Sequence, residues 1–449
     1  MKQLNIALIH CHDTGRYISP YGFAVDTPHM LRAAQEGMLF RQMYCAAPAC
    51  SPSRAAMLTG QCAHSAGMLG LVNRGFDIAC PERHLAKMLS EHGFHTILAG
   101  VQHILRDRSG SPYDEILDIS GMDTPKIVGQ GLQSLDRLPK DAPFFLDIGF
   151  GDTHRPFDTE HLIYDPNYVR PPLPLPDTPA VRRDFAGFME AARRYDDAVG
   201  MVLGGLRDRH LLDNTLVIIT TDHGIAFPGM KCNLTTHGTG VLFILRKPGL
   251  VPVGTVCDQL VSQVDLYPTL LDLAGIEHPA WLQGRSMVPL LQDTETPIHE
   301  EIFVEQTYHC NYEPERGIRT GRYLYIERSV EYPRTHAANC DPGLSKTEAM
   351  EKGWLDRAVD DVQLYDTYFD PHETCNLAYD ARYRQIADGL HTRLLAWETQ
   401  TGDPLLQKGA GRVMGYTANT QDGRVYVSAY EDVEPQDIWQ YEEQKPGYA

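Results

Sequence analysis

Residues 50–60 read Cys-Ser-Pro-Ser-Arg-Ala-Ala-Met-Leu-Thr-Gly, and this segment organises the rest of the chain. Pro52 suits the first turn of a helix, because the N–H group that proline lacks has no partner there, and Gly60 is a typical helix end. The segment therefore predicts a helix with Cys50 at its N-terminus, where free N–H groups and the dipole favour a bound anion. Arg54 lies one turn further along the same face. A nucleophile, a positive helix end and an Arg fork together indicate attack on a tetrahedral oxyanion.

Composition narrows the class of protein. A chain of 449 residues with 43% hydrophobic content can bury a large core and is expected to form two domains. The net charge of −19 disfavours nucleic-acid binding and requires any anion site to be local and preorganised. No apolar run has the length of a signal peptide or a transmembrane helix. The ten cysteines are irregularly spaced, which favours reduced thiols and a cytoplasmic protein without membrane partners.

Apolar runs alternate with helical patterns along the first 310 residues, which predicts an α/β fold with a mainly parallel sheet. The expected strands are 5–9, 39–44, 94–98, 143–149, 216–219 and 241–245, and the expected helices are 27–37, 85–93, 182–207 and 262–273. Residues 1–310 are thus predicted to form the catalytic domain. Residues 311–449 are predicted to form a smaller subdomain with a hairpin at 318–327, a helix at 379–398 and an acidic tail from Asp422.

Polar side chains follow four of these predicted strands. His12 and Asp13 follow the first strand, His103 follows the third, His154 follows the fourth, and the pair at 222–223 (Asp-His) follows the fifth. Ligands of open α/β sheets bind beyond the carboxyl ends of the strands. We therefore expect these groups to meet around the N-terminus of the helix that begins at Cys50.

The segment at 50–60 resembles the signature of the type I sulfatases of the alkaline phosphatase superfamily, which is Cys, a small residue, Pro, Ser, Arg, three variable residues, Leu, Thr and Gly. The resemblance implies that a formylglycine-generating enzyme converts Cys50 to formylglycine, and that the hydrated aldehyde is the nucleophile. It also implies a large mixed, mainly parallel sheet sandwiched by helices, with a smaller C-terminal α+β subdomain.

The resemblance further implies one divalent metal ion. Its ligands would be His12, Asp13, Cys50, Asp222 and His223. His12 stands where the family has an Asp. The family metal is Ca²⁺, which prefers oxygen ligands, whereas two imidazoles, from His12 and His223, would shift the preference toward Mn²⁺ or Zn²⁺.

Catalytic roles are carried over in the same way. Arg54 and Lys231 would neutralise the oxyanion, with His154, assisted by Lys231, protonating the leaving atom. His103 would take the proton of the second hydroxyl and so expel sulfate. Val101 occupies the position of a sulfate-binding Lys of the family.

Three further residues are predicted to line the substrate pocket. His64 follows the nucleophile helix, His309 lies within the acidic segment 305–315, and Arg316 directly follows that segment.

Three functions remain open at this point. The favoured one is a sulfatase or sulfamidase acting on a sulfated small molecule or oligosaccharide, because residues 214–218, 222–228, 364–366 and 370–377 resemble the sulfamidase branch of the family. A phosphonate monoester or phosphodiester hydrolase is the second, since the 222–223 pair and Val101 suit a less charged transferring group. An inactive protein that binds sulfated glycans is the third, supported by His12 and Val101. Assembly into a homo-oligomer is left open.

Overall fold

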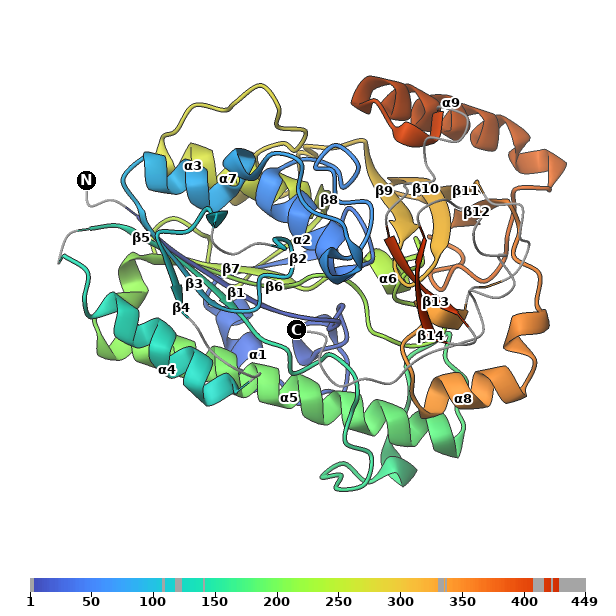
Figure 1. Cartoon of the computed structure of the whole chain (residues 1–449), viewed down its shortest axis with the longest axis horizontal. Helices are drawn as coiled ribbons and strands as arrows, with labels where there is room; N and C mark the ends of the chain where they lie inside the picture. The colour runs from blue at the N-terminus through green and yellow to red at the C-terminus, as the bar shows by residue number, and fades with distance from the viewer. Residues whose placement is uncertain are drawn as a thin grey trace.

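The computed structural model describes residues 4–106, 110–117, 123–139, 142–329, 335 and 337–406, together with the backbone of 416–420 and 423–427. An eight-stranded sheet with strand order β4-β3-β5-β1-β6-β7-β2-β8 forms the centre (Figure 1). Its strands are β1 (Asn5–Cys11), β2 (Met38–Tyr44), β3 (His95–Gly100), β4 (Glu115–Leu117), β5 (Phe144–Gly149), β6 (Thr215–Thr221), β7 (Phe243–Arg246) and β8 (Thr255–Ser262). All neighbouring pairs are parallel except those of β7, which runs antiparallel to both β6 and β2. The predicted mixed, mainly parallel sheet is therefore confirmed.

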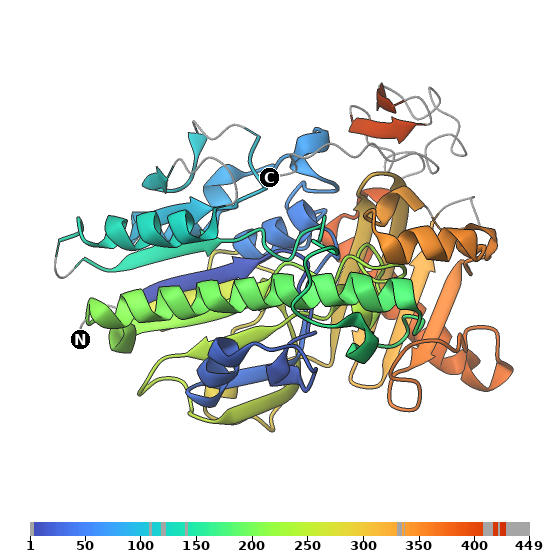
Figure 2. The same cartoon turned by 90° about the horizontal axis from the view of Figure 1, so that it is seen from below.

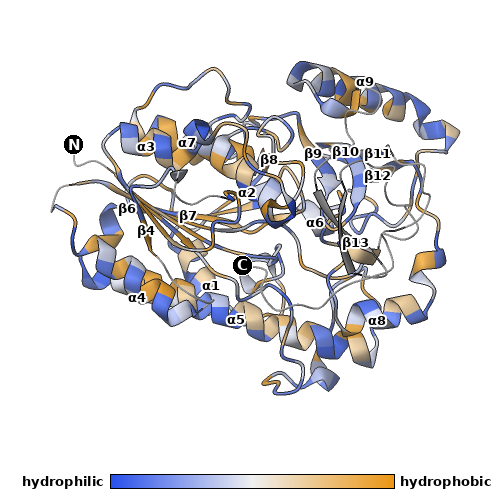
Figure 3. Cartoon of the chain, viewed as in Figure 1, coloured by the Kyte–Doolittle hydropathy of each residue, from blue (hydrophilic) through white to orange (hydrophobic). Residues whose placement is uncertain are grey.

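Helices cover both faces of this sheet, as Figures 1 and 2 show. One face carries α2 (Cys50–Thr59), α3 (Leu85–Glu91) and α7 (Leu266–Ala274); the other carries α1 (Pro28–Gln35), α4 (Thr124–Leu135) and α5 (Pro179–Asp208). Side chains of a strand alternate between the two faces. In β1, Ile6 and Leu8 join the core under α2, whereas Ala7 and Ile9 join the core over α5. The strands are accordingly apolar along most of their length (Figure 3), as expected when both faces are covered.

A second, antiparallel sheet with the order β12-β11-β10-β9 packs beside the first. It consists of β9 (Glu301–Tyr308), β10 (Tyr312–Thr320), β11 (Tyr323–Arg328) and β12 (Val362–Asp366), and it is followed by α9 (Arg384–Thr401). The predicted hairpin at 318–327 corresponds to β10 and β11. Because β9 pairs with β10, the predicted domain boundary at residue 310 falls inside this sheet, whose first strand begins at Glu301.

Further elements differ from expectation in detail. The segment 329–360, which shows no periodic pattern, contains α8 (Leu344–Glu351). Strands β13 (Tyr416–Thr420) and β14 (Gly423–Val427) form a separate two-stranded sheet. Most of the predicted acidic tail lies outside the described residues. None of the helices in the described part of the chain is long and apolar enough to span a bilayer.

Candidate active site

The carboxyl ends of β1, β5 and β6 and the N-terminus of α2 converge on one buried cluster. Cys50 is the first residue of α2 and is 2% exposed. Its Sγ atom lies 3.3 Å from Nε2 of His223. Burial raises the pKa of the Cys50 thiol well above its ordinary value, although Lys231 opposes the shift. The unmodified side chain is therefore a neutral thiol rather than a nucleophilic thiolate.

His12, Asp13, Cys50 and Asp222 bring four candidate ligand atoms within 4.8 Å of one another. Asp222 is fixed by two backbone donors, since its Oδ1 accepts from the N–H groups of Asp13 and His223 at 2.9 Å each. Nε2 of His223 lies 3.2 Å from Oδ1 of Asp13. All five residues predicted as metal ligands thus lie together at the ends of β1 and β6 and the start of α2.

These residues fit a divalent cation. Both ring nitrogens of His12 are buried without a hydrogen bond among the described residues, although Nδ1 lies 3.0 Å from Oδ2 of Asp222. Burial and then Arg54 hold the pKa of His12 well below its ordinary value. A neutral imidazole with a free lone pair beside two carboxylates is a metal-binding arrangement.

Lys231 contacts the carboxylate oxygen of Asp13 that does not face His223. Its Nζ atom is 3.0 Å from Oδ2 of Asp13 and 2.9 Å from Oδ2 of Asp341. Burial lowers the pKa of Lys231, but the two carboxylates outweigh burial and hold this pKa well above its ordinary value. Lys231 is therefore a fixed cation. Asp341 was missed in the sequence, because it lies in the segment 329–360 and no motif surrounds it.

Arg54 is buried one turn along α2 from Cys50. Its Nη2 atom lies 3.1 Å from Oδ2 of Asp222 and donates to the carbonyl oxygen of Cys11 at 3.2 Å. Its Nη1 atom lies 2.6 Å from Nδ1 of His10. The guanidinium is thereby fixed beside the candidate metal ligands.

Three further imidazoles surround this cluster. The ring centroids of His103 and His154 lie 6.0 and 5.2 Å from that of His12. Burial, and next Arg54, lowers the pKa of His103 to about 3, so this ring is neutral. His154 donates from Nδ1 to the carbonyl oxygen of Arg155 at 2.7 Å, which leaves Nε2 for a reacting group. His309 is buried, and burial and the nearby Lys231 lower its pKa.

Two of the residues predicted to bind substrate have other partners. His64 lies 3.0 Å from Oε2 of Glu305, and its side chain is 1% exposed. Arg316 pairs with Asp403 through Nε and Nη2 and donates to the carbonyl oxygen of Gln306. Both residues therefore belong to a buried ionic cluster between the loop after α2 and the second sheet. The prediction that they bind substrate is not supported, because their polar atoms already face protein partners.

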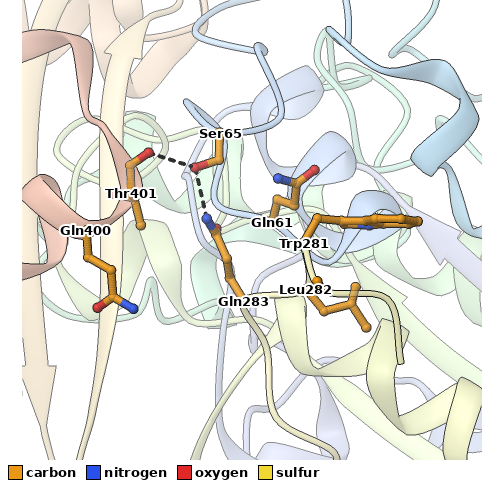
Figure 4. A pocket seen from close by; sticks show the side chains of 8 residues that line it. Gln61, Ser65, Trp281, Leu282, Gln283, Gln400 and Thr401 are labelled. Atoms are coloured by element: carbon orange, nitrogen blue, oxygen red, sulfur yellow. Dashed lines mark hydrogen bonds between the residues drawn. The ribbon is translucent and has the colours of Figure 1, made fainter. Parts of the chain in front are cut away.

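A pocket of about 440 Å³ opens beyond the C-terminal end of α2 (Figure 4). It is lined by Gln61, Ser65, Ala280, Trp281, Leu282, Gln283, Gln400 and Thr401. Since α2 has ten residues, this pocket lies about 15 Å from Cys50. It contains none of the predicted catalytic residues and is distinct from the cluster at the strand ends.

Two family models match the sequence of this chain. The family model described as Sulfatase matches residues 5–276, and the model described as N-sulphoglucosamine sulphohydrolase, C-terminal, matches residues 236–332. The human protein N-sulphoglucosamine sulphohydrolase is 32% identical over 467 residues, covering 89% of this chain and 91% of the human one.

Two solved structures share the fold at lower identity. One is a protein in complex with its substrate D-glucosamine-2-N,6-O-disulfate, with a TM-score of 0.68, 19% identity, and coverage of 90% of this chain and 99% of that one. The other is a phosphonate monoester hydrolase from Silicibacter pomeroyi, with a TM-score of 0.69, 18% identity, and coverage of 95% and 100%.

Proposed function

We propose, since this chain belongs to the sulfatase family, that it hydrolyses the N-sulfate of a glucosamine residue in a sulfated sugar. The chain is a hydrolase of sulfate esters or sulfamates, and the proposal concerns the bond and the sugar. The observation that carries it is the 32% identity to the human N-sulphoglucosamine sulphohydrolase, which extends over 89% of this chain. The match of residues 236–332 to the C-terminal model of that enzyme supports the same substrate class.

The residues of the cluster supply each step of such a hydrolysis. Cys50, after oxidation to formylglycine, provides the nucleophile at the N-terminus of α2. Arg54 and Lys231 are fixed cations that neutralise charge on the transferring group. When protonated, His154 donates from Nε2 to the leaving nitrogen. His103, held neutral by burial, accepts the proton whose removal releases sulfate.

A divalent ion would be held by the carboxylates of Asp13 and Asp222, the Cys50-derived group, and the imidazoles of His12 and His223. Bound there, it would supply Lewis-acid polarisation of the transferring group. We propose Mn²⁺ or Zn²⁺ in preference to Ca²⁺, because the orphaned His12 imidazole adds a second nitrogen donor. Elemental analysis of the purified protein tests this choice, and stoichiometric Ca²⁺ would contradict it.

A panel of four substrates tests the proposed reaction: glucosamine N-sulfate, glucosamine 6-O-sulfate, an aryl sulfate and an aryl phosphonate monoester. The enzyme is produced together with a formylglycine-generating enzyme, beside Cys50→Ala as the matched control. The expected result is sulfate release chiefly from the N-sulfate, and none with Cys50→Ala. Preference for the 6-O-sulfate would refute the proposed bond while leaving the chain a sulfatase.

Phosphonate monoester hydrolysis is the second candidate. Val101 favours it, because this buried apolar side chain stands where the sulfatase pattern has a cation, and a phosphonate monoester presents two non-bridging oxygens to the site instead of three. Turnover of the phosphonate above all three sulfates would support this alternative.

We also propose a cellular compartment for this protein. Cys11, Cys45, Cys62 and Cys232 are buried free thiols, which supports a reducing compartment such as the cytoplasm. Expected partners are the sulfated sugar and a formylglycine-generating enzyme. A homo-oligomer would be detected by the mass of the protein in solution.

A further inference from the structure

A buried chain of hydrogen bonds leads from Arg54 into the interior of the large sheet. Nδ1 of His10 lies 2.6 Å from Nη1 of Arg54, and Nε2 of the same ring lies 2.7 Å from Oδ1 of Asp147. The hydroxyl of Tyr113 donates to the other oxygen of Asp147. All four side chains are at least nine-tenths buried.

The direction of these bonds follows from the donors available. An arginine has no acceptor atoms, so Nδ1 of His10 must accept from Arg54. The proton of the neutral ring is then on Nε2 and is donated to Asp147. Asp147 thus fixes the tautomer in which His10 can accept from Arg54.

The sheet is shaped to hold this imidazole. In the register between β1 and β5, His10 is opposite Gly149, and Leu8 is opposite Asp147. A Cβ atom at Gly149 would lie 2.3 Å from Cε1 of His10, so only glycine leaves room for the ring. A charged carboxylate within a central strand is costly to bury. Apolar residues at positions 10 and 147 would stabilise the packed sheet at least as well.

We propose that His10 is a positioning residue for the reaction, with Asp147 and Tyr113 holding its ring. His10 engages Nη1 of Arg54, while Asp222 and the carbonyl of Cys11 engage Nη2. The guanidinium then cannot rotate, and its Nε atom, which has no hydrogen-bond partner among the described residues, remains for the transferring oxyanion. The inference rests on the proposed function, because it assigns Arg54 to that oxyanion.

Variants that remove these hydrogen-bonded side chains separate a role of His10 in positioning Arg54 from a role in stability. The combination His10→Leu, Asp147→Leu and Tyr113→Phe replaces His10 and its two partners by apolar groups, while Arg54 keeps Asp222 as its counterion. His10→Gln is the conservative variant, because its amide can accept from Arg54 and donate to Asp147. His299→Gln is the matched control, since His299 also pairs with a buried carboxylate, Asp265, at 2.9 Å, but outside the cluster.

Three quantities are measured for each variant: the midpoint of thermal unfolding, kcat and KM on the best substrate of the panel, and the dissociation constant of inorganic sulfate by calorimetry. The apolar triple variant is expected to remain folded, because Arg54 keeps its contacts with Asp222 and the carbonyl oxygen of Cys11. Its kcat should fall about 100-fold, the typical cost of a misplaced group, and its sulfate affinity should fall about tenfold or more. His10→Gln should recover most of both losses, and His299→Gln should show neither.

Wild-type kcat and sulfate affinity in a stable apolar variant would overturn the proposal. So would a loss of activity that follows the unfolding temperature across all variants. A wild-type enzyme inactive on the whole panel would refute the proposed function instead, and the sulfate affinities would then still decide the role of His10.

Discussion

Replacing His64 by Gln should destabilise the protein in a pH-dependent way. Burial lowers the pKa of His64, but Glu305, 3.0 Å away, and Cys62 outweigh it and raise this pKa to about 11. His64 in turn lowers the pKa of Glu305 to about 2, against the opposing effect of burial. These pKa shifts mean that the pair of His64 and Glu305 stabilises the folded protein only when the imidazole is charged.

The two pKa shifts correspond to different free energies for the contact between His64 and Glu305. The shift of His64 corresponds to about 6 kcal/mol and that of Glu305 to about 3 kcal/mol. They differ because His64 also faces Cys62 and lies 3.7 Å from Asp403, whereas the Glu305 shift mainly reflects the pair and Arg316. We expect a loss of about 3 kcal/mol, because Gln keeps a donor toward Glu305 and because breaking buried pairs costs this much.

The sign of the pH dependence follows from the raised pKa. The contribution of His64 is complete below 6.5, the ordinary value, and is lost as the pH rises toward 11. That of Glu305 is present above 4.5 and is lost as the pH falls toward 2. The wild type should therefore exceed His64→Gln by about 3 kcal/mol at pH 5.5. At about 1.4 kcal/mol per pH unit, most of this difference should disappear by pH 8.5.

Urea unfolding followed by tryptophan fluorescence at both pH values measures this difference. His278→Gln is the matched control, because His278 pairs with Asp272 at 2.8 Å but both side chains are about 40% exposed; its effect should stay below about 1 kcal/mol. A difference for His64→Gln that is equal at both pH values would refute the reasoning. A large rise in KM with unchanged stability would instead restore His64 as a substrate-binding residue.

Three other substitutions test the cluster at the strand ends. Asp341→Asn removes one carboxylate from Lys231, so kcat/KM should fall about 10- to 100-fold, the value of one charged hydrogen bond; steady-state kinetics with an unchanged rate would contradict this. His12→Asp restores an oxygen donor, and elemental analysis should then find a shift toward Ca²⁺; an unaltered metal content would show that His12 is not a ligand. His103→Asn should release one equivalent of desulfated product and then stall, and a linear time course by rapid quench would exclude the proposed role of His103.

The sequence predicts the large sheet and the convergence of its strand ends well, for a physical reason. Strands buried on both faces are short apolar runs, and the polar groups that follow them must lie at the sheet edge. His12, Asp13 and Asp222 are found in this way. The same reading treats β1 and β5 as purely structural, and so it overlooks His10 and Asp147, whose polar atoms meet only across the sheet.

Contacts between distant segments limited the rest of the prediction. Asp341 approaches Lys231 because the segment after β11 returns to the site, and its Asp-Pro-Gly sequence by itself indicates only a turn. His64 and Arg316 are polar residues near the expected pocket, but their counterions Glu305 and Asp403 come from other elements. A sequence pattern shows that a charged group is present but not which partner neutralises it.

The burial of Cys50 bears on when its proposed oxidation to formylglycine would occur. Every residue of α2 is buried once the chain has folded. A formylglycine-generating enzyme therefore cannot bind the segment at 50–60 in the folded protein. The proposed oxidation of Cys50 would therefore have to precede the docking of α2 onto the sheet, and the two processes would compete in time. A chain that folds before this oxidation would be stable but permanently inactive. The fraction of active enzyme would then depend on how quickly the modifying enzyme bound the nascent segment.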